Sequence, residues 1–168
     1  MAERNPNLIS PKTMEAMAST AGSGRELFSE IFTKINNAKD KPKKIEVLRK
    51  YDTPNMRMVL KGAFDPKIEW DLPPGIPPYI TNEAPAGTEH TYLELEAKRL
   101  YNFVKGGNNQ LNKIRKETLF IQMLEGLHAD EAKVLIDMKN KTLNKTYKGL
   151  TSEMVKEAFG WNADFVKP

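Results

Sequence analysis

The sequence predicts a mainly α-helical fold: a small bundle of five to seven helices with a proline-rich extended belt and an N-terminal arm. From Thr91 to Met138, apolar residues recur at spacings of three and four, which is typical of buried helix faces. Between Asp65 and Gly87, six of 23 residues are proline, which excludes a helix there. These patterns divide the chain into an arm (1–22), a basic helical segment (23–64), a proline-rich connector (65–90) and a helical core (91–168).

Length and composition indicate a single modest core. The chain has 168 residues, of which 39% are hydrophobic. No apolar run approaches the roughly eighteen residues of a membrane span, and the first residues lack the apolar stretch of a secretory signal. We therefore expect neither a membrane span nor export. The absence of cysteine excludes disulfides, a thiolate nucleophile and a cysteine metal site.

The basic segment predicts three short helices. Ser23 and Glu26 have the spacing of a capping box, which predicts a helix from there to about Asn37. Asp40 followed by Pro42 predicts a second helix, because proline is tolerated in a first turn. Thr53 repeats this device before Pro54, and a third helix then continues to about Phe64. The apolar face of the first helix comprises Leu27, Phe28, Ile31, Phe32 and Ile35.

The connector reads as extended chain. The stretch Ile68–Leu72 alternates apolar and polar residues, as one short strand or extended segment would. The prolines that follow favour a polyproline-like path across the surface, joining the basic helices to the core.

The C-terminal part predicts four helices. Thr88 or Thr91 is positioned to cap the first, and Gly106-Gly107 ends it with a left-handed turn. Asn108 or Asn109 then caps the longest helix, which runs to about Leu127. A third begins at His128, and after a polar connection from Asn140 to Leu150 a last one runs from Thr151 through Phe159. The expected buried positions include Leu93, Leu100, Val104, Leu111, Ile114, Ile121, Leu124, Leu127, Ala132, Leu135 and Ile136.

The charge is unevenly distributed. The net charge is +4. The stretch from Lys34 to Lys61 contains nine basic and three acidic residues, and a second basic block from Lys98 to Lys116 contains no acidic residue. The simplest interpretation is a solvated lysine-rich face. The alternative is contact with nucleic-acid phosphates, for which the candidates are Lys41, Lys43, Lys44, Arg49, Lys50 and Arg57.

Motifs for catalysis are missing from the sequence. Glycine-containing segments at 21–25 and 105–109 precede helices but lack the Gly-Lys-Ser/Thr ending of a phosphate-binding loop. His90 and His128 are far apart, and no nucleophile elbow is present. We therefore expect a protein that is not an enzyme, with no catalytic residues, no cofactor, no metal and no small-molecule substrate.

One apolar stretch in the connector has the character of a partner-binding segment. Prolines hold the chain extended at low entropic cost, and apolar side chains on such a strip suit the groove of another protein. Packing within this chain is the alternative interpretation. The candidate partner-binding residues are Trp70, Ile76, Pro77, Pro78 and Tyr79.

Six stretches between Phe64 and Thr151 carry a family resemblance. They include Leu72-Pro73-Pro74-Gly75-Ile76-Pro77-Pro78-Tyr79, Arg99-Leu100-Tyr101-Asn102-Phe103-Val104 and Tyr147-Lys148-Gly149-Leu150-Thr151. In these residues the chain resembles a family of small proteins of tailed bacteriophages, T4-like and especially marine or cyanobacterial ones, whose function is not established. Ala129 stands where that family often has proline, which weakens the helix-start signal after His128.

The resemblance implies a viral setting. We expect a phage protein that acts through protein–protein contacts, with other virion proteins or with itself, in the host cytoplasm or as a structural part of the virion. The alternative is a basic accessory factor that binds nucleic acid or a host protein during phage replication. Neither hypothesis involves a membrane.

Overall fold

The computed structural model describes residues 26–81, 91 and 93–168, and this part of the chain is mainly helical, as predicted. Within it no strand forms, and Trp70 and Val104 make one isolated antiparallel bridge. The elements are α2 (Phe28–Asn37), α3 (Lys41–Lys50), α4 (Pro54–Phe64), α5 (Leu93–Glu96), the 3-10 helix η1 (Ala97–Phe103), α6 (Lys113–Gly126), α7 (Ala129–Asn140), α8 (Leu143–Thr146) and α9 (Ser152–Phe159). None of these helices is long and apolar enough to cross a membrane.

Six of the described helices have eight residues or more, which is within the predicted five to seven. The structure differs from the prediction in its short helices. α5 and α8 are single turns, and α8 lies in the stretch that we expected to be a plain connection. A helix of four residues leaves no strong local signal, because so short a helix depends on its tertiary contacts.

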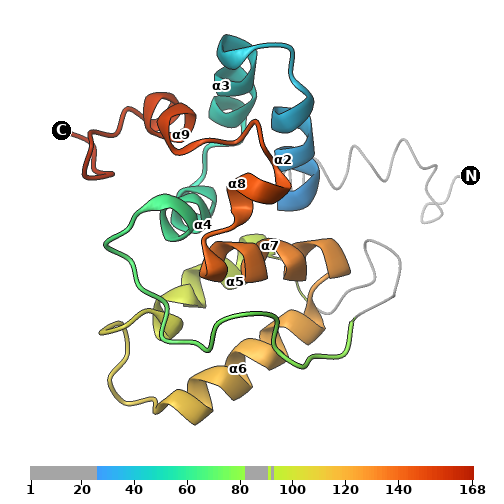
Figure 1. Cartoon of the computed structure of the whole chain (residues 1–168), viewed down its shortest axis with the longest axis vertical. Coiled ribbons are helices and arrows are strands. Elements are labelled where there is room, and N and C mark those ends of the chain that lie inside the picture. Colours follow the sequence, from blue (N-terminus) through green and yellow to red (C-terminus); the bar gives the residue numbers. More distant parts are fainter. Residues whose placement is uncertain (1–25, 82–90, 92) are drawn as a thin grey trace, which may run out of the picture.

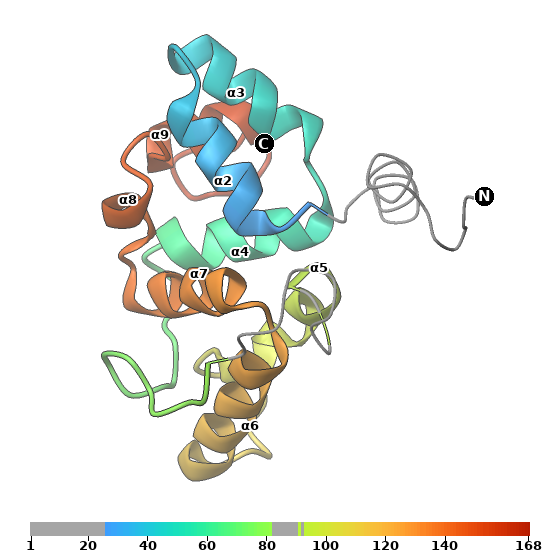
Figure 2. The ribbon, with the colours of Figure 1, turned by 90° about the vertical axis from the view of Figure 1, so that its right-hand side faces the viewer.

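The helices stack from one end of the molecule to the other. α2, α3 and α9 pack together at one end, α4 and α7 pack against each other in the middle, and α6 lies at the opposite end (Figures 1 and 2). One continuous hydrophobic cluster contains residues from both sides of the proline-rich connector. Its fully buried side chains include Phe32, Leu60, Leu100 and Leu135. The basic helices thus share a core with the C-terminal helices.

Most helix starts follow the predicted capping residues. The side chains of Asp40, Thr53 and Thr151 accept hydrogen bonds from backbone N–H groups three residues on, and His128 accepts one from Asp130. α2 instead begins after Leu27, whose N–H donates to Glu30 Oε1 over 2.8 Å. Ser23 and Thr88 lie outside the described residues.

Two predictions for the C-terminal helices were wrong in detail. α6 is capped by Asn112, not by Asn108 or Asn109, so Ile114 falls in the first turn and is 76% exposed. The expected helix that ends before Gly106 is a single α-turn followed by η1. The reason is its spacing: Ala97, Leu100 and Phe103 are three residues apart, and three residues per turn bring all three into the core.

Four basic side chains bind the carbonyl groups at helix ends or in the connector. Lys44 donates to the carbonyls of Ile35, Asn36 and Ala38, at the end of α2. Arg49 binds the last turn of α9, and Lys141 donates to the carbonyls of Gly62 and Asp65 at the end of α4. Lys139, described below, binds the connector. Because the last carbonyls of a helix have no partner within it, these cations complete the helices.

A buried carboxylate joins α7 to the start of α2. Glu131 is 1% exposed, and its Oε2 accepts a hydrogen bond from the Ser29 N–H over 3.1 Å. Burial, together with the nearby charge of Glu30, raises the pKa of Glu131 to about 7, and the hydrogen bonds from backbone N–H groups oppose this shift only in part. The folded state therefore binds this proton more tightly than the unfolded state does.

We expect the carboxyl of Glu131 to make stability pH-dependent. Its contribution is present below the unfolded pKa of about 4.5 and is lost as the pH rises through about 7. Between pH 5 and pH 8, the free energy of unfolding of the wild type should fall about 2 to 3 kcal/mol more than that of Glu131→Gln, which cannot ionise. Urea unfolding across this range measures the difference, and parallel pH profiles for the two proteins would contradict the assignment.

Gly62 provides a test of core packing. A Cβ at this position would lie 2.5 Å from Cζ2 of Trp70, a buried ring. Alanine normally stabilises a helix interior by about 1 kcal/mol relative to glycine, but here we expect Gly62→Ala to destabilise the fold by about 1 to 3 kcal/mol. Adding Trp70→Phe removes the atom in the way, so the two changes should be less than additive in chemical unfolding. Simple additivity would refute the contact.

Candidate partner-binding surface

The proline-rich connector is fixed to the rest of the fold at its first part. We use the name belt for its described residues, 66–81, which run across α6 and α7 (green in Figure 1). Beside the Trp70–Val104 bridge, the Asp71 N–H donates to the Phe103 carbonyl over 2.7 Å, and the Lys105 N–H donates to the Glu69 carbonyl over 2.8 Å. The belt is therefore anchored to the residues around the end of η1.

Trp70 does not belong to an exposed strip. Its side chain is 8% exposed, and its Nε1–H donates to the Gly62 carbonyl over 3.0 Å. The prediction that Trp70 binds a partner is wrong, because the alternation along Ile68–Leu72 turns this ring inward, onto α4. Intramolecular packing is the correct interpretation for this residue.

Lys139, near the end of α7, holds the middle of the belt. Its ammonium donates to the carbonyls of Pro73 and Gly75 over 2.8 and 2.7 Å and to Asn140 Oδ1 over 2.7 Å. The Asn140 amide forms a reciprocal pair with Gly75, whose N–H donates to Oδ1 and whose carbonyl accepts from Nδ2. Gly75 has a φ of +88°, which favours glycine at this turn. Burial lowers the pKa of Lys139.

A partly buried ion pair holds the start of the belt. Lys116 is 4% exposed and lies 2.9 Å from Asp71 Oδ2. The hydrogen bond from Lys116, with a further contribution from Lys113, keeps the pKa of Asp71 below its usual value. The sequence places Lys116 in a basic block, but its charge serves this internal contact.

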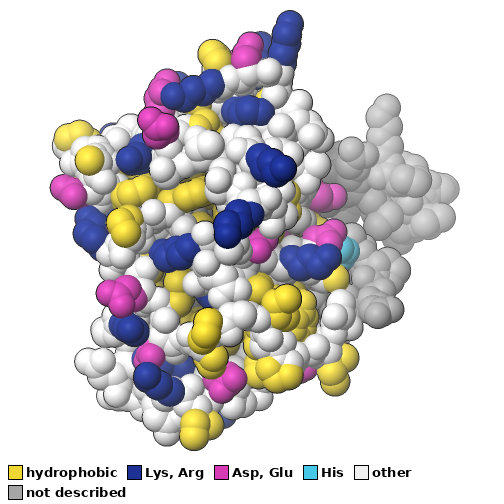
Figure 3. Space-filling view, in the orientation of Figure 1, with side chains coloured by type: hydrophobic (Ala, Val, Ile, Leu, Met, Phe, Trp, Pro, Cys, Tyr) yellow, Lys and Arg dark blue, Asp and Glu magenta, His cyan; other side chains and the backbone are white. Residues whose placement is uncertain are grey.

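The end of the belt presents two isoleucines to solvent. Ile76 is 77% exposed and Ile80 is 79% exposed, although hydrogen bonds hold the backbone at Gly75 and at Ile80. Pro78 is also exposed, whereas Pro77 and Tyr79 are half-buried. The Ile80 N–H donates to Glu125 Oε2 over 2.8 Å. Apolar side chains accordingly gather where the belt crosses the lower part of the molecule (Figure 3).

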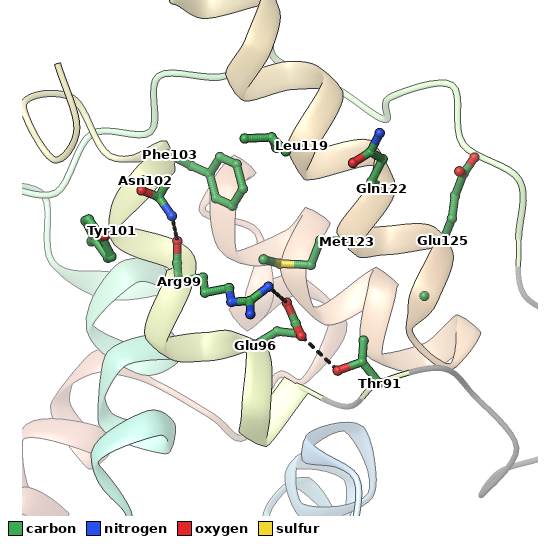
Figure 4. Close-up of a pocket in the computed structure, with 11 residues that line it drawn as sticks. Thr91, Glu96, Arg99, Tyr101, Asn102, Phe103, Leu119, Gln122, Met123 and Glu125 are labelled. Atoms are coloured by element: carbon green, nitrogen blue, oxygen red, sulfur yellow. Dashed lines mark hydrogen bonds and ion pairs between the residues drawn. The ribbon is translucent and has the colours of Figure 1, made fainter. Parts of the chain in front are cut away.

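A cavity of 840 Å³ adjoins this stretch, between η1 and α6. Phe103 from η1 and Met123 from α6 point into it (Figure 4). At one side Arg99 lies 3.8 Å from Glu96, whose other oxygen accepts from Thr91 Oγ1 over 2.8 Å. The complete lining is Thr91, Glu96, Arg99, Tyr101, Asn102, Phe103, Leu119, Gln122, Met123, Glu125 and Gly126.

The cavity has an apolar floor and a polar rim, which is the arrangement of a site for an apolar side chain. Because Glu125 both lines the cavity and binds the belt at Ile80, the two features form one surface. We name Ile76, Pro78, Ile80 and this cavity the belt–groove face. Sequence reasoning missed the cavity, because it depends on the relative placement of η1 and α6, which no local pattern encodes.

The structure revises the candidate phosphate contacts. Lys44 and Arg49 bind helix-end carbonyls, which corrects the interpretation of these two side chains as phosphate contacts. Lys41 pairs with Glu157 over 3.2 Å and Arg57 with Asp52 over 2.6 Å. The other two candidates make only longer contacts: Lys43 Nζ lies 3.9 Å from a Glu46 carboxylate oxygen, and Lys50 Nζ lies 5.5 Å from the centre of the Tyr51 ring.

The chain belongs to a family of unknown function, DUF6433, which matches residues 31–145. The matched region extends from α2 to α8 and so includes the belt and the cavity. No curated protein and no solved structure matches the chain.

We expect Lys139→Met to loosen the belt. Methionine keeps the length of the side chain but leaves the carbonyls of Pro73 and Gly75 without their donor, so the free energy of unfolding should fall by about 1 to 3 kcal/mol. Limited proteolysis should cut the variant within 66–81 faster than the wild type. Lys133→Met, at an exposed position of the same helix, is the control. Equal behaviour of the two variants would show that Lys139 does not hold the belt.

Proposed function

We propose that this chain is a non-enzymatic phage protein that acts through protein–protein contacts made by the belt–groove face. The supporting observation is the exposure of Ile76 and Ile80 on a backbone that internal hydrogen bonds fix in place. Apolar side chains held in this way can bind without the entropic cost of ordering the chain first. The neighbouring cavity offers a partner an apolar recess with a polar rim.

The phage setting rests on the sequence resemblance described above. Within it, a virion-associated structural role is our first choice, with other virion proteins or a second copy of this chain as partner. We place its action in the host cytoplasm, where such particles assemble, or in the virion itself.

The accessory-factor hypothesis is less well supported on the outer side of α3. Lys41 on α3 and Arg57 on α4 are paired with carboxylates, and Arg49 binds the end of α9. Paired cations attract phosphates less than free ones do. The six sequence candidates therefore do not form one free cationic surface.

Capture from phage-infected cells tests the proposal. Tagged wild-type protein should retain a phage protein that Ile76→Asp/Ile80→Asp loses, because a carboxylate cannot be buried in an apolar contact without a partner. Ile114→Asp is the matched control, since Ile114 is 76% exposed on the first turn of α6. It should retain the same protein.

Mass spectrometry of purified virions tests the structural role separately. We expect peptides of this chain in the particles. Absence from particles, together with capture of host polymerase or ribosomes by both the wild type and the Ile76→Asp/Ile80→Asp variant, would favour the accessory factor instead.

A further inference from the structure

A second surface, separate from the belt–groove face, carries unpaired positive charge. Between Asp137 and Glu153 the sequence has four lysines and no acidic residue. Two of them, Lys139 and Lys141, bind carbonyls as described. The other two, Lys145 on α8 and Lys148 after it, are exposed and form no ion pair within the described residues.

The fold brings these two lysines next to the turn between α2 and α3. The Gly149 N–H donates to Asn36 Oδ1 over 2.7 Å, and a Cβ on Gly149 would lie 3.0 Å from Lys44 Nζ. Lys39 and Lys43 line one shallow hollow at this turn. We name Lys39, Lys43, Lys145 and Lys148 the lysine strip. Figure 3 shows basic side chains following one another over α3, the loop before α9 and α8.

The strip has little compensating charge. Lys43 has one distant carboxylate, that of Glu46 at 3.9 Å, and the other three lysines make no ion pair with any described residue. Lys44, beside Gly149, is not part of the strip, because its ammonium is bound to three neutral carbonyls. Asp40, next to Lys39, accepts a hydrogen bond from the Lys43 N–H, and Asp137, before Lys145, accepts hydrogen bonds from Thr142 and Thr146. The positive charge is therefore available to an external polyanion.

The chemistry of the strip favours phosphates over an acidic protein. Interfaces with proteins are anchored by apolar and aromatic side chains, whereas phosphate contacts need only cations and hydrogen-bond donors. The strip has no such anchor, because the large exposed hydrophobic side chains among the described residues all lie elsewhere: Ile76, Ile80, Leu95, Tyr101, Ile114 and Val166.

Its chemistry also favours a duplex over a single strand. Binding of single strands relies on bases stacked on exposed aromatic rings. Tyr147, the aromatic residue between Lys145 and Lys148, is half-buried and packs edge-on against Phe32, with 5.5 Å between ring centres. A duplex presents a regular row of phosphates and requires no stacking.

We propose that the lysine strip binds the phosphate backbone of duplex DNA without reading its sequence. This activity goes beyond the proposed protein contact and does not depend on it. Lys145 and Lys148 are its main free cations, and Lys39 and Lys43 extend it to the α2–α3 turn. Together with the belt–groove face, the strip would allow the protein to contact a partner protein and DNA at the same time.

Fluorescence anisotropy with a labelled duplex of about 20 base pairs at about 50 mM salt tests this proposal. Lys145→Gln/Lys148→Gln should weaken binding at least about tenfold and lower the slope of log K against log salt by about 2. Lys105→Gln/Lys113→Gln is the control, because it removes the same charge from two exposed lysines outside the strip. The control should change affinity by less than about threefold, and Ile76→Asp/Ile80→Asp should leave it unchanged.

Several outcomes would overturn the proposal. Failure of the wild type to bind the duplex at low salt would contradict it. Equal weakening of binding by the two double substitutions would also contradict it, because only the net charge would then matter. Tighter binding of a single strand than of the duplex would contradict the duplex assignment. Competition by polyglutamate as strong as that of the duplex, at equal charge, would point to an acidic protein partner instead.

Discussion

Hydrogen bonds from basic side chains to backbone carbonyls hold the helix ends and the belt of this fold in place. Lys44, Arg49 and Lys141 bind the ends of α2, α9 and α4, and Lys139 binds the belt. Each connects parts of the chain that the helices alone would leave separate. A buried carbonyl without a donor costs about 1 to 3 kcal/mol, and an ammonium removed from water needs several acceptors. The carbonyls therefore gain a donor, and the basic side chains gain acceptors.

The same bonds explain how a proline-rich segment can present apolar side chains to solvent. The belt has no helix or sheet of its own, yet Lys139, Asn140 and the Lys116–Asp71 pair fix its course over α6 and α7. A fixed course matters for recognition, because a segment that is already ordered does not lose conformational entropy on binding. The exposure of Ile76 and Ile80 is then a property of the folded state that a partner can use.

Local sequence signals predicted local structure well. The caps at Asp40, Thr53 and Thr151 depend on residues within one turn, so their spacing was enough to identify them. Features that depend on distant residues were out of reach: the burial of Trp70 requires α4, and the cavity requires the relative placement of η1 and α6. The lysines show the same limit, because sequence alone does not separate a solvated Lys145 from a Lys139 that binds carbonyls.

Hydrogen exchange of the belt amides, followed residue by residue by NMR, tests the central claim most directly. If the belt is fixed as described, the N–H groups of Asp71, Gly75 and Ile80, which donate to Phe103, Asn140 and Glu125, should exchange far more slowly than in an unfolded chain. The exposed amide of Ile76, for which no acceptor is found among the described residues, should exchange faster than these three. Exchange of all four at unfolded-chain rates would contradict the account.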